Sequence, residues 1–520
     1  MEATGANGVV ATPNPLASHA GLDVLQAGGN AVDACIAACA VLGVVSPGQC
    51  GIGGDLFAII CSPGSQQPIV LNASGRAGSK ATPAFIGDSR MPEHGALAVV
   101  TPGCVAGWAA ALERFGSRHL SALLKPAIRL AEDGFPIGSG LARAMAAAAP
   151  QINSEAQQTF APEGRVPQPG DLLRQPNLAR SLRRVADDGP GVLYQGDLGE
   201  AIGRFLEQEG GHHVVADLAS YAPEWVEPVR VDFRGYQVYT APPNSQGLLH
   251  LLALSLLDPM DMGVPASVRT THLQLEAMAF ALEAARQAIA DPEFVPAPVE
   301  RLLSAELAAE GRSRIGMSAA PGRMVPAAAG DTVYLCAADR EGTVVSMIQS
   351  LRQGFGCGLM VPGLGVVLNN RGRDFALADG DANQIAPGKR PRHTLSPGMV
   401  LRDGKAVAAY GTRGGDGQPY TMLQLGCNLL AFGMDPQAAL DAPRWSVEPA
   451  QKGPRAGKVT LEGRFSQETV AGLAALGHET AAIDDFDASC GVASMIQFDG
   501  KRRTWLGGSD PRGSGLALGL

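Results

Sequence analysis

Apolar positions along the chain follow helical spacing in some segments and strand-like runs in others, which predicts a mixed α and β protein. Near the start, residues 16–26 are helix-like and end at Gly28-Gly29, and Asn30 then caps a second helix over 31–45. Further helices are expected over residues 104–115, 120–133, 178–185, 247–257, 268–289 and 420–432, and strands over 56–61, 69–71, 236–239, 332–350, 398–410 and 491–498.

The order of these elements indicates one interwoven domain. No regular strand-helix-strand alternation is visible, and no low-complexity linker divides the chain. Residues 151–170 and 376–392 are rich in Pro, Gly, Asn and Gln, so we expect loops there of the kind that line a site.

A hairpin in the second half of the chain has a threonine at its leading edge. Val333–Cys336 and Thr343–Met347 favour strands, and Asp339–Gly342 between them is a turn tetrad. On one interpretation Thr332 simply opens a strand, as β-branched residues often do. On the other, the chain is cut before Thr332, so that its hydroxyl is a nucleophile and its freed amine the base.

A glycine-rich junction could stabilise the negative charge that such a nucleophile generates. An apolar strand over residues 408–412 runs into Gly414-Gly415 and then into a helix. Successive backbone N–H groups at such a junction can point at one anion, and the helix N-terminus adds partial positive charge. A plain strand-to-helix turn is the alternative. Gly51–Asp55 is a similar segment that does not fit a dinucleotide-binding loop.

Composition narrows the class of function. With 46% hydrophobic and 18% charged residues the chain is expected to be compact and folded, and a net charge of −9 without lysine or arginine blocks argues against nucleic-acid binding. The start of the chain has no basic segment followed by an apolar core, and no run of about 18 apolar residues occurs. We therefore expect a cytoplasmic protein that acts on a small molecule.

Cysteines and histidines give no metal-ligand pattern in the sequence. The nine cysteines include no CxxC pair and mostly lie in apolar stretches, and the histidines are scattered. The pair His212-His213 follows Gly210-Gly211 and is expected in a surface turn. Neither a metal site nor a disulfide framework is predicted.

The motifs together, in their order and spacing, resemble the gamma-glutamyltranspeptidase family of N-terminal-nucleophile hydrolases along nearly the whole chain. The matching blocks before Thr332 are GGNAVDA (28–34), GIGG (51–54), TPGCVAG (101–107), RGYQVY (234–239) and APPNSQG (241–247). After Thr332 they are LNN (368–370), DF (374–375), PGKRP (387–391), SP (396–397), GG (414–415) and APR (442–444).

This resemblance implies an α+β fold, the four-layer αββα sandwich of N-terminal-nucleophile hydrolases, and a precursor that cuts itself between Asp331 and Thr332. The Thr332 hydroxyl would attack the Asp331 carbonyl and form an ester by an N-to-O acyl shift. Water would then hydrolyse this ester and release the new N-terminus. Chains 1–331 and 332–520 would remain associated as a heterodimer, either alone or as a dimer of such pairs. No cofactor is implied, because nucleophile, base and oxyanion donors all come from the chain.

The resemblance also implies roles for other residues. Ser350 would be a second hydroxyl that supports the nucleophile, and Gly414 with Gly415 would supply the oxyanion N–H groups. Asp374 matches an acidic residue that holds the substrate's ammonium group in the family. The α-amine of Thr332, with an ordinary pKa of about 7.7–8.0, would be the base near neutral pH.

This sequence departs from the family pattern at positions that in the family lie around the substrate. The arginine that grips the glutamyl carboxylate in the transpeptidases is missing from its usual place, and Arg76 follows two positions later. Arg352 stands in place of an asparagine, Arg371 in place of a glutamine, and His393-Thr394 in place of two serines. A cation about 4 Å from an ammonium group opposes it by about 4 kcal/mol at an effective dielectric near 20, whereas arginine pairs well with carboxylates.

The sequence thus predicts an N-terminal-threonine amidohydrolase whose substrate carries an acid but no α-amine. Its motifs are closest to the branch containing oxamate amidohydrolase and glutaryl-type acylases. The alternative for the arginines is that they pair with Asp374 and its neighbours. Two alternatives for the function are a true glutathione-cleaving gamma-glutamyltranspeptidase and an unprocessed relative that binds a small acid without catalysis.

Overall fold

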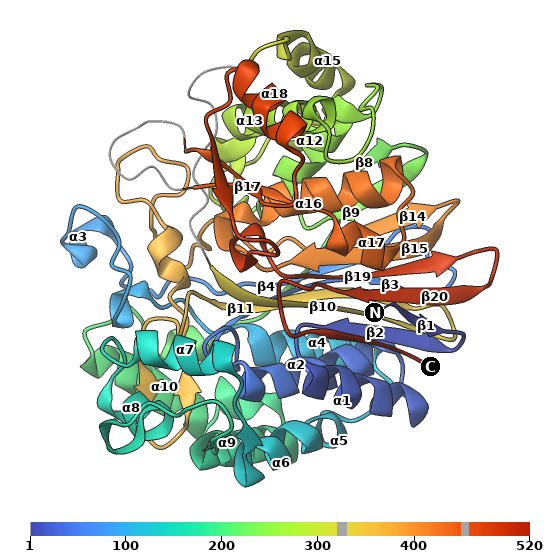
Figure 1. The fold of residues 1–520 in the computed structure, drawn as a ribbon. Helices are drawn as coiled ribbons and strands as arrows, with labels where there is room; N and C mark the ends of the chain where they lie inside the picture. Colours follow the sequence, from blue (N-terminus) through green and yellow to red (C-terminus); the bar gives the residue numbers. More distant parts are fainter. Residues whose placement is uncertain (1, 320–329, 449–456) are drawn as a thin grey trace.

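Two seven-stranded antiparallel sheets stacked face to face form the centre of the molecule (Figure 1). The computed structural model describes residues 2–319, 330–448 and 457–520. The first sheet has the order β21 (Leu516–Gly519), β2 (Gly8–Thr12), β10 (Asp331–Asp339), β11 (Val344–Arg352), β3 (Asp55–Cys61), β4 (Ile69–Ala73), β7 (Glu224–Val226). The second has the order β1 (Ala3–Gly5), β20 (Thr504–Ser509), β19 (Ala493–Asp499), β15 (Lys405–Thr412), β14 (Gly398–Arg402), β9 (Tyr236–Thr240), β8 (Val229–Phe233).

Apolar side chains fill the space between the sheets. Phe57 and Ile59 from the first sheet and Met399 and Trp505 from the second belong to one buried cluster. Facing sheets pack about 10 Å apart through such interdigitated side chains. The two sheets are therefore the inner layers of the molecule.

Helices cover the outer face of each sheet (Figure 1). On the first sheet lie α1 (Pro15–Gln26), α2 (Ala31–Val45) and α4 (Cys104–Phe115), and α2 is buried along its whole length because it is apolar on all sides. On the second sheet lie α12 (Leu248–Leu257) and α16 (Gln418–Gly426), and α13 (Val268–Ala285) packs against α12. This order of layers confirms the predicted αββα sandwich.

The remaining elements surround these layers. The helices are α3 (Pro83–Ile86), α5 (Leu120–Leu123), α6 (Lys125–Asp133), α7 (Ser139–Ala148), α8 (Ser154–Phe160), α9 (Pro176–Asp188), α10 (Asp197–Gln208), α11 (Val215–Ala219), α14 (Val299–Leu302), α15 (Ala305–Arg314), α17 (Pro436–Asp441) and α18 (Gln467–Ala475). Short strands are β5 (Phe135–Pro136), β6 (Leu172–Leu173), β12 (Met360–Val361), β13 (Val366–Val367), β16 (Trp445–Val447), β17 (Val459–Glu462) and β18 (Thr480–Ile483). No helix in the described ranges combines the length and apolarity that crossing a bilayer requires.

Most predicted elements are confirmed, and three differ. The helix expected over 120–133 is interrupted at Leu124, just before Pro126, which cannot donate an intrahelical hydrogen bond. The loop expected over 151–170 contains α8, which Asn153 caps by accepting from the Ala156 N–H. The helix expected over 420–432 begins earlier, at Gln418, and its last turn widens into a π-helical turn over Cys427–Ala431.

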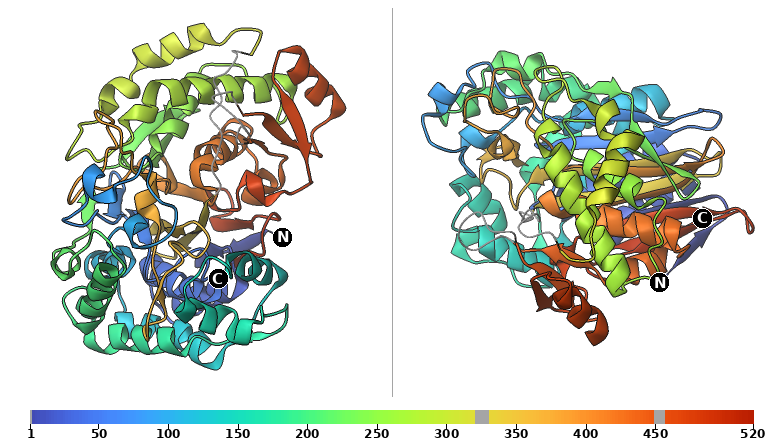
Figure 2. Two further views of the ribbon diagram at one scale, coloured as in Figure 1. Left: turned by 90° about the vertical axis from the view of Figure 1, so that its left-hand side faces the viewer. Right: turned by 90° about the horizontal axis from the view of Figure 1, so that it is seen from above.

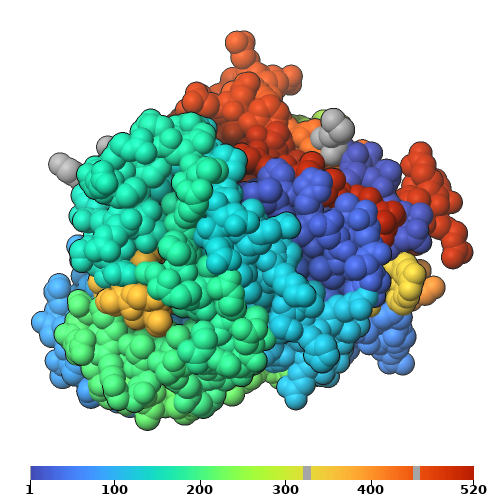
Figure 3. Space-filling view, turned by 90° about the horizontal axis from the view of Figure 1, so that it is seen from below, coloured from blue at the N-terminus to red at the C-terminus, as the bar shows by residue number. Residues whose placement is uncertain are grey.

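Segments from before and after residue 331 are mixed throughout the fold. Both central sheets contain strands from both segments. The β12–β13 hairpin also reaches the surface between helices of the first segment, where it is the yellow-orange patch among teal and green atoms in Figure 3. There the Ser181 hydroxyl donates to the Leu364 carbonyl at 2.7 Å. Figure 2 shows the same mixing of colours from two further sides.

Candidate active site

A β-bulge at the start of the β10–β11 hairpin brings two hydroxyl side chains together. Asp331 pairs with Arg352 and Val333 with Gln349, so one residue of β10, Thr332, faces two residues of β11. Bulges re-aim side chains and are frequent beside active sites. Arg352 takes up part of the irregularity with a φ of +84°, in the left-handed region that side chains other than glycine seldom adopt.

The hydroxyl groups of Thr332 and Ser350 form a directed chain of hydrogen bonds. Ser350 Oγ donates to the Asp331 carbonyl oxygen at 2.7 Å and lies 3.0 Å from Thr332 Oγ1. Because a serine hydroxyl has one hydrogen and a carbonyl oxygen cannot donate, the Thr332 hydroxyl is the donor to Ser350. The Arg352 N–H also donates to Ser350 Oγ, at 2.8 Å. Both hydroxyl residues are buried, with Thr332 1% exposed and Ser350 fully buried.

Gly414 and Gly415 lie on the other side of this point, at the end of β15. Their φ angles of +141° and +56° suit glycine, and neither N–H has a hydrogen-bond partner within the described part of the chain. Gly415 lies against the residue that precedes Asp331, since a Cβ atom on Gly330 would come within 2.7 Å of the Gly415 Cα. Two unpaired N–H groups thus lie near the Asp331–Thr332 bond.

Gln246, from the turn before α12, connects the glycines to a further predicted residue. Its Nε2 donates to the Gly415 carbonyl at 2.9 Å and to the Thr394 carbonyl at 3.1 Å. The Thr394 hydroxyl in turn accepts from Arg371 Nη1 at 2.9 Å. The glycine turn and the arginine cluster therefore belong to one connected site.

Arg352 and Arg371 both bind the carboxylate of Asp374. Arg352 donates through Nε at 2.6 Å and Nη2 at 2.8 Å, and Arg371 donates through Nη1 at 3.1 Å. Arg371 Nε also donates to Asp55 at 3.1 Å, and His393 Nε2 lies 3.2 Å from the same carboxylate oxygen. The predicted residues Arg352, Arg371, Asp374, His393 and Thr394 are thus brought together with Asp55.

The formal charges of this cluster balance. Arg392 pairs with Asp416 at 2.7 Å, so three guanidinium groups face three carboxylates. Burial alone would raise the pKa of Asp374, but Arg352 and the other arginines hold it well below its usual range. Burial and the charge of Arg371 lower the pKa of His393 to about 4, so its imidazole is neutral near pH 7. Because every carboxylate is already bonded to a guanidinium, the cluster does not offer a cation site.

Two other predicted positions lie differently in the structure. The guanidinium of Arg76 binds Glu224 and Glu293, both at 2.7 Å, and these carboxylates are not part of the cluster around Asp374. His212 and His213 are fully buried, so the expected surface turn is wrong. His212 accepts a hydrogen bond from the Gly78 N–H at 3.0 Å, a contact between distant segments that the local sequence does not indicate.

Four residues of the connected site were not singled out from the sequence: Asp55, Gln246, Arg392 and Asp416. All four lie inside or directly beside motifs that were recognised, since Asp55 follows Gly51–Gly54, Gln246 belongs to residues 241–247, Arg392 follows residues 387–391, and Asp416 follows Gly414-Gly415. A search for polar residues next to each glycine-rich motif would have found them.

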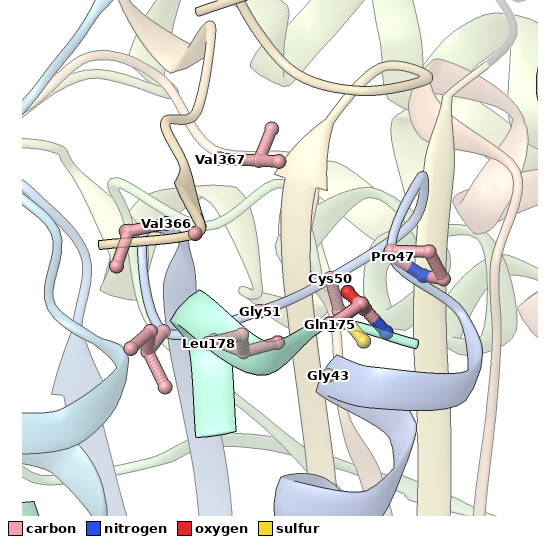
Figure 4. A pocket seen from close by; sticks show the side chains of 10 residues that line it. Gly43, Pro47, Cys50, Gly51, Gln175, Leu178, Val366 and Val367 are labelled. Atoms are coloured by element: carbon pink, nitrogen blue, oxygen red, sulfur yellow. The ribbon is translucent and has the colours of Figure 1, made fainter. Parts of the chain in front are cut away.

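Two hollows of the described structure contain none of the predicted site residues. Figure 4 shows one of about 10 Å³, the size of a single water, lined by Gly43, Pro47, Cys50, Gln175 and Leu178 among others. A larger surface hollow of about 430 Å³ lies against α13, α14 and α15 and contains none of the predicted site residues. In the continuous chain, Gly330 lies against Gly415 and Arg352 in the site itself.

A four-layer αββα sandwich with a threonine hydroxyl at the start of a central strand defines an N-terminal-nucleophile hydrolase. The chain belongs to the gamma-glutamyltranspeptidase family, whose model (Gamma-glutamyltranspeptidase) matches residues 17–520. It is therefore an enzyme that acts on amide bonds. The resemblance recognised from the motifs is confirmed.

Individual relatives cover nearly the whole chain. The chain is 36% identical to the Glutathione hydrolase-like YwrD proenzyme of Bacillus subtilis (strain 168) over 99% of both proteins. It is also 36% identical to the Oxamate amidohydrolase proenzyme of Klebsiella pneumoniae, over 99% of this chain and 98% of the relative. The crystal structure of a cephalosporin acylase from Bacillus halodurans superposes with a TM-score of 0.93 at 37% identity and covers all of this chain.

Proposed function

We propose that the protein cuts itself before Thr332 and then hydrolyses a small acyl amide that carries a carboxylate, through an acyl ester on Thr332. The observation that carries the proposal is the hydrogen-bond chain from the Thr332 hydroxyl through Ser350 to the Asp331 carbonyl. Relatives that are named proenzymes support a precursor of this kind.

The hydrogen-bond chain suits the self-cleavage step because it returns the proton that the nucleophile loses. As Thr332 Oγ1 attacks the Asp331 carbonyl carbon, its proton passes to Ser350 Oγ, and the Ser350 proton passes to the carbonyl oxygen. The C–N bond then breaks, the proton moves to the Thr332 nitrogen, and an ester forms. Water hydrolyses the ester, which leaves a carboxylate at 331 and a free α-amine at 332.

The same groups then act on the substrate. The freed α-amine of Thr332 takes the hydroxyl proton, and the N–H groups of Gly414 and Gly415 bind the oxyanion of the tetrahedral intermediate. Residues 1–331 and 332–520 stay associated as a heterodimer, since each contributes strands to both central sheets.

The state of Asp374 argues against an amino-acid substrate. One of its oxygens accepts from Arg352 Nη2, and the other accepts from both Arg352 Nε and Arg371 Nη1. Little acceptor capacity remains for an ammonium group, which would also face two guanidinium charges. By contrast, Arg371 Nη2 is buried and has no hydrogen-bond partner within the described residues, so it is available to a substrate carboxylate or carbonyl.

Two amides with the same leaving group test the substrate class. Glutaryl 4-nitroanilide and gamma-glutamyl 4-nitroanilide differ only in the α-amine, and repulsion of about 4 kcal/mol predicts at least about a hundredfold higher kcat/KM for the glutaryl compound. Release of ammonia from oxamate tests the shortest acid of this class. A preference for the gamma-glutamyl compound would favour the alternative, a glutathione-cleaving gamma-glutamyltranspeptidase.

Denaturing electrophoresis tests the cut. In proportion to 331 and 189 of the 520 residues in 53.6 kDa, cleavage yields pieces of about 34 and 20 kDa. The Thr332→Ala protein should remain whole, because it lacks the hydroxyl. Wild-type protein that stays whole and inactive after long incubation would support the non-catalytic alternative.

A further inference from the structure

A group of buried side chains of the types that bind metals lies where α13 meets the end of α18, and none of its members belongs to the connected site around Thr332. The two helices lie side by side in Figures 1 and 2, α13 in green and α18 in red. His272 and Glu276 are four residues apart on α13 and therefore share one face of that helix. His478 follows α18, just before β18. The group thus combines residues from before and after the proposed cut.

The donor atoms of the three side chains converge. His272 Nδ1 lies 2.8 Å from His478 Nε2, and one ring nitrogen of each histidine and a Glu276 carboxylate oxygen all lie within 4.8 Å of one another. All three residues are buried, and His478 is 8% exposed, which leaves a way in for a small ion.

A backbone carbonyl fixes the orientation of His272. Its Nε2–H donates to the Gly316 carbonyl oxygen at 2.9 Å, so in the neutral ring the lone pair is on Nδ1, which faces His478 Nε2. Histidine ligands of metal ions are typically oriented in this way by a hydrogen bond from the second ring nitrogen.

We propose that His272 Nδ1, Glu276 and His478 Nε2 bind one divalent transition-metal ion of the zinc type. Two imidazoles and a carboxylate are a ligand set that favours such ions over calcium or magnesium. Zinc–ligand bonds of about 2.0–2.2 Å in a tetrahedron separate the donor atoms by about 3.3–3.5 Å. Without the ion, the 2.8 Å contact is a hydrogen bond from His478 Nε2–H to His272 Nδ1. Metal binding therefore requires small side-chain rotations and the His478 proton on Nδ1 in place of Nε2.

The proposed role of the ion is structural, because its three ligands do not belong to the connected site around Thr332 and join two segments. It connects α13, in residues 1–331, to His478, in residues 332–520. The chain that leaves α15 passes the same place, where the Ala319 N–H donates to the Leu476 carbonyl at 2.6 Å. A bound ion therefore ties the end of the first segment to the second, whether or not the chain is cut.

Zinc titration by calorimetry tests the site on chelator-treated protein. The wild type and the Thr332→Ala variant should each bind one Zn²⁺ per 520-residue chain or cleaved pair. His478→Gln and Glu276→Gln should each weaken this binding by at least about a hundredfold, since loss of even an outer partner of a ligand costs about 10- to 100-fold. His94→Gln, at an exposed position, is the control and should bind as the wild type does.

Equal affinity in the wild type and His478→Gln, or no saturable site in the wild type, would overturn the proposal. A measurement on the wild type alone covers the case in which a variant does not fold. Co²⁺ should give the intense visible absorption of a four-coordinate site, and only the weak absorption of the hydrated ion would count against the site. Zinc and cobalt binding are measured without an amide substrate, so the result tests the metal site whichever amide the enzyme cleaves.

Discussion

The Ser350 hydroxyl lies 2.7 Å from the Asp331 carbonyl oxygen and donates to it. This contact polarises the carbonyl that Thr332 is proposed to attack, and loss of one such donor typically costs about a hundred- to thousandfold in rate. Ser350→Ala should therefore slow the appearance of the two pieces by about that factor. A time course of newly synthesised protein on a denaturing gel measures the rate.

Ser346 provides a matched control on the same strand. It is also a buried serine of β11, but its hydroxyl is bonded to the Tyr334 hydroxyl at 2.8 Å and not to Asp331. Ser346→Ala should leave the cleavage rate near that of the wild type. Equal slowing by both substitutions would mean that packing of the strand, and not the hydrogen-bond chain, sets the rate.

Gly414→Ala should impair turnover after cleavage. With φ at +141°, the backbone there is in a region that only glycine adopts without strain, so an alanine would rotate the N–H groups away from the oxyanion. We expect kcat to fall by about a hundredfold with 4-nitroanilide substrates. Gly342→Ala, in the exposed turn of the β10–β11 hairpin at φ +94°, imposes strain without touching the site and should keep kcat.

The sequence was sufficient to predict the hairpin at Thr332 because its strands are local, apolar and separated by a turn tetrad. It could not predict the bulge between Asp331 and Val333, since that depends on how two strands are aligned. Segment 151–170 illustrates another limit. Its loop-like composition concealed α8, which depends on a cap by Asn153 and on burial of Phe160.

Contacts between distant segments account for the rest of what was missed. Arg371 was recognised as unusual, but its partner Asp55 is 316 residues away in sequence. The pair His272 and His478 is separated by 206 residues, and only His272 and Glu276 have a helical spacing that a sequence can reveal. Buried polar groups must find partners, yet the identity of the partner is a property of the fold.

Asp374→Asn should destabilise the protein strongly. Removing the carboxylate leaves Arg352 without its principal buried counter-charge, and breaking a buried ion pair from one side typically costs about 3–5 kcal/mol. Urea unfolding measures the difference. Glu132→Gln, which breaks the exposed pair with Arg183, should cost about 1 kcal/mol or less. A similar small cost for Asp374→Asn would mean that solvent or other groups already neutralise the arginines.

Stability should fall as the pH drops from 7 to 5, and His250 should account for part of the loss. This histidine is fully buried on α12, and burial lowers its pKa to about 4. In the unfolded chain the ordinary pKa is about 6.5, so between these values the unfolded state binds the proton and the folded state does not. A group of this kind destabilises the fold increasingly as the pH falls below 6.5, until the folded pKa is reached.

From pH 7 to pH 5 this difference corresponds to a loss of about 2 kcal/mol for His250 alone. His250→Leu, which suits the surrounding leucines, should therefore reduce the change in unfolding free energy between the two pH values by about that amount. His250→Gln serves as a second variant that keeps a polar side chain but does not titrate, and exposed His94→Gln is the control. Urea unfolding at both pH values gives the comparison. An unchanged pH dependence in both His250 variants would mean that this ring is protonated in the folded protein at pH 5.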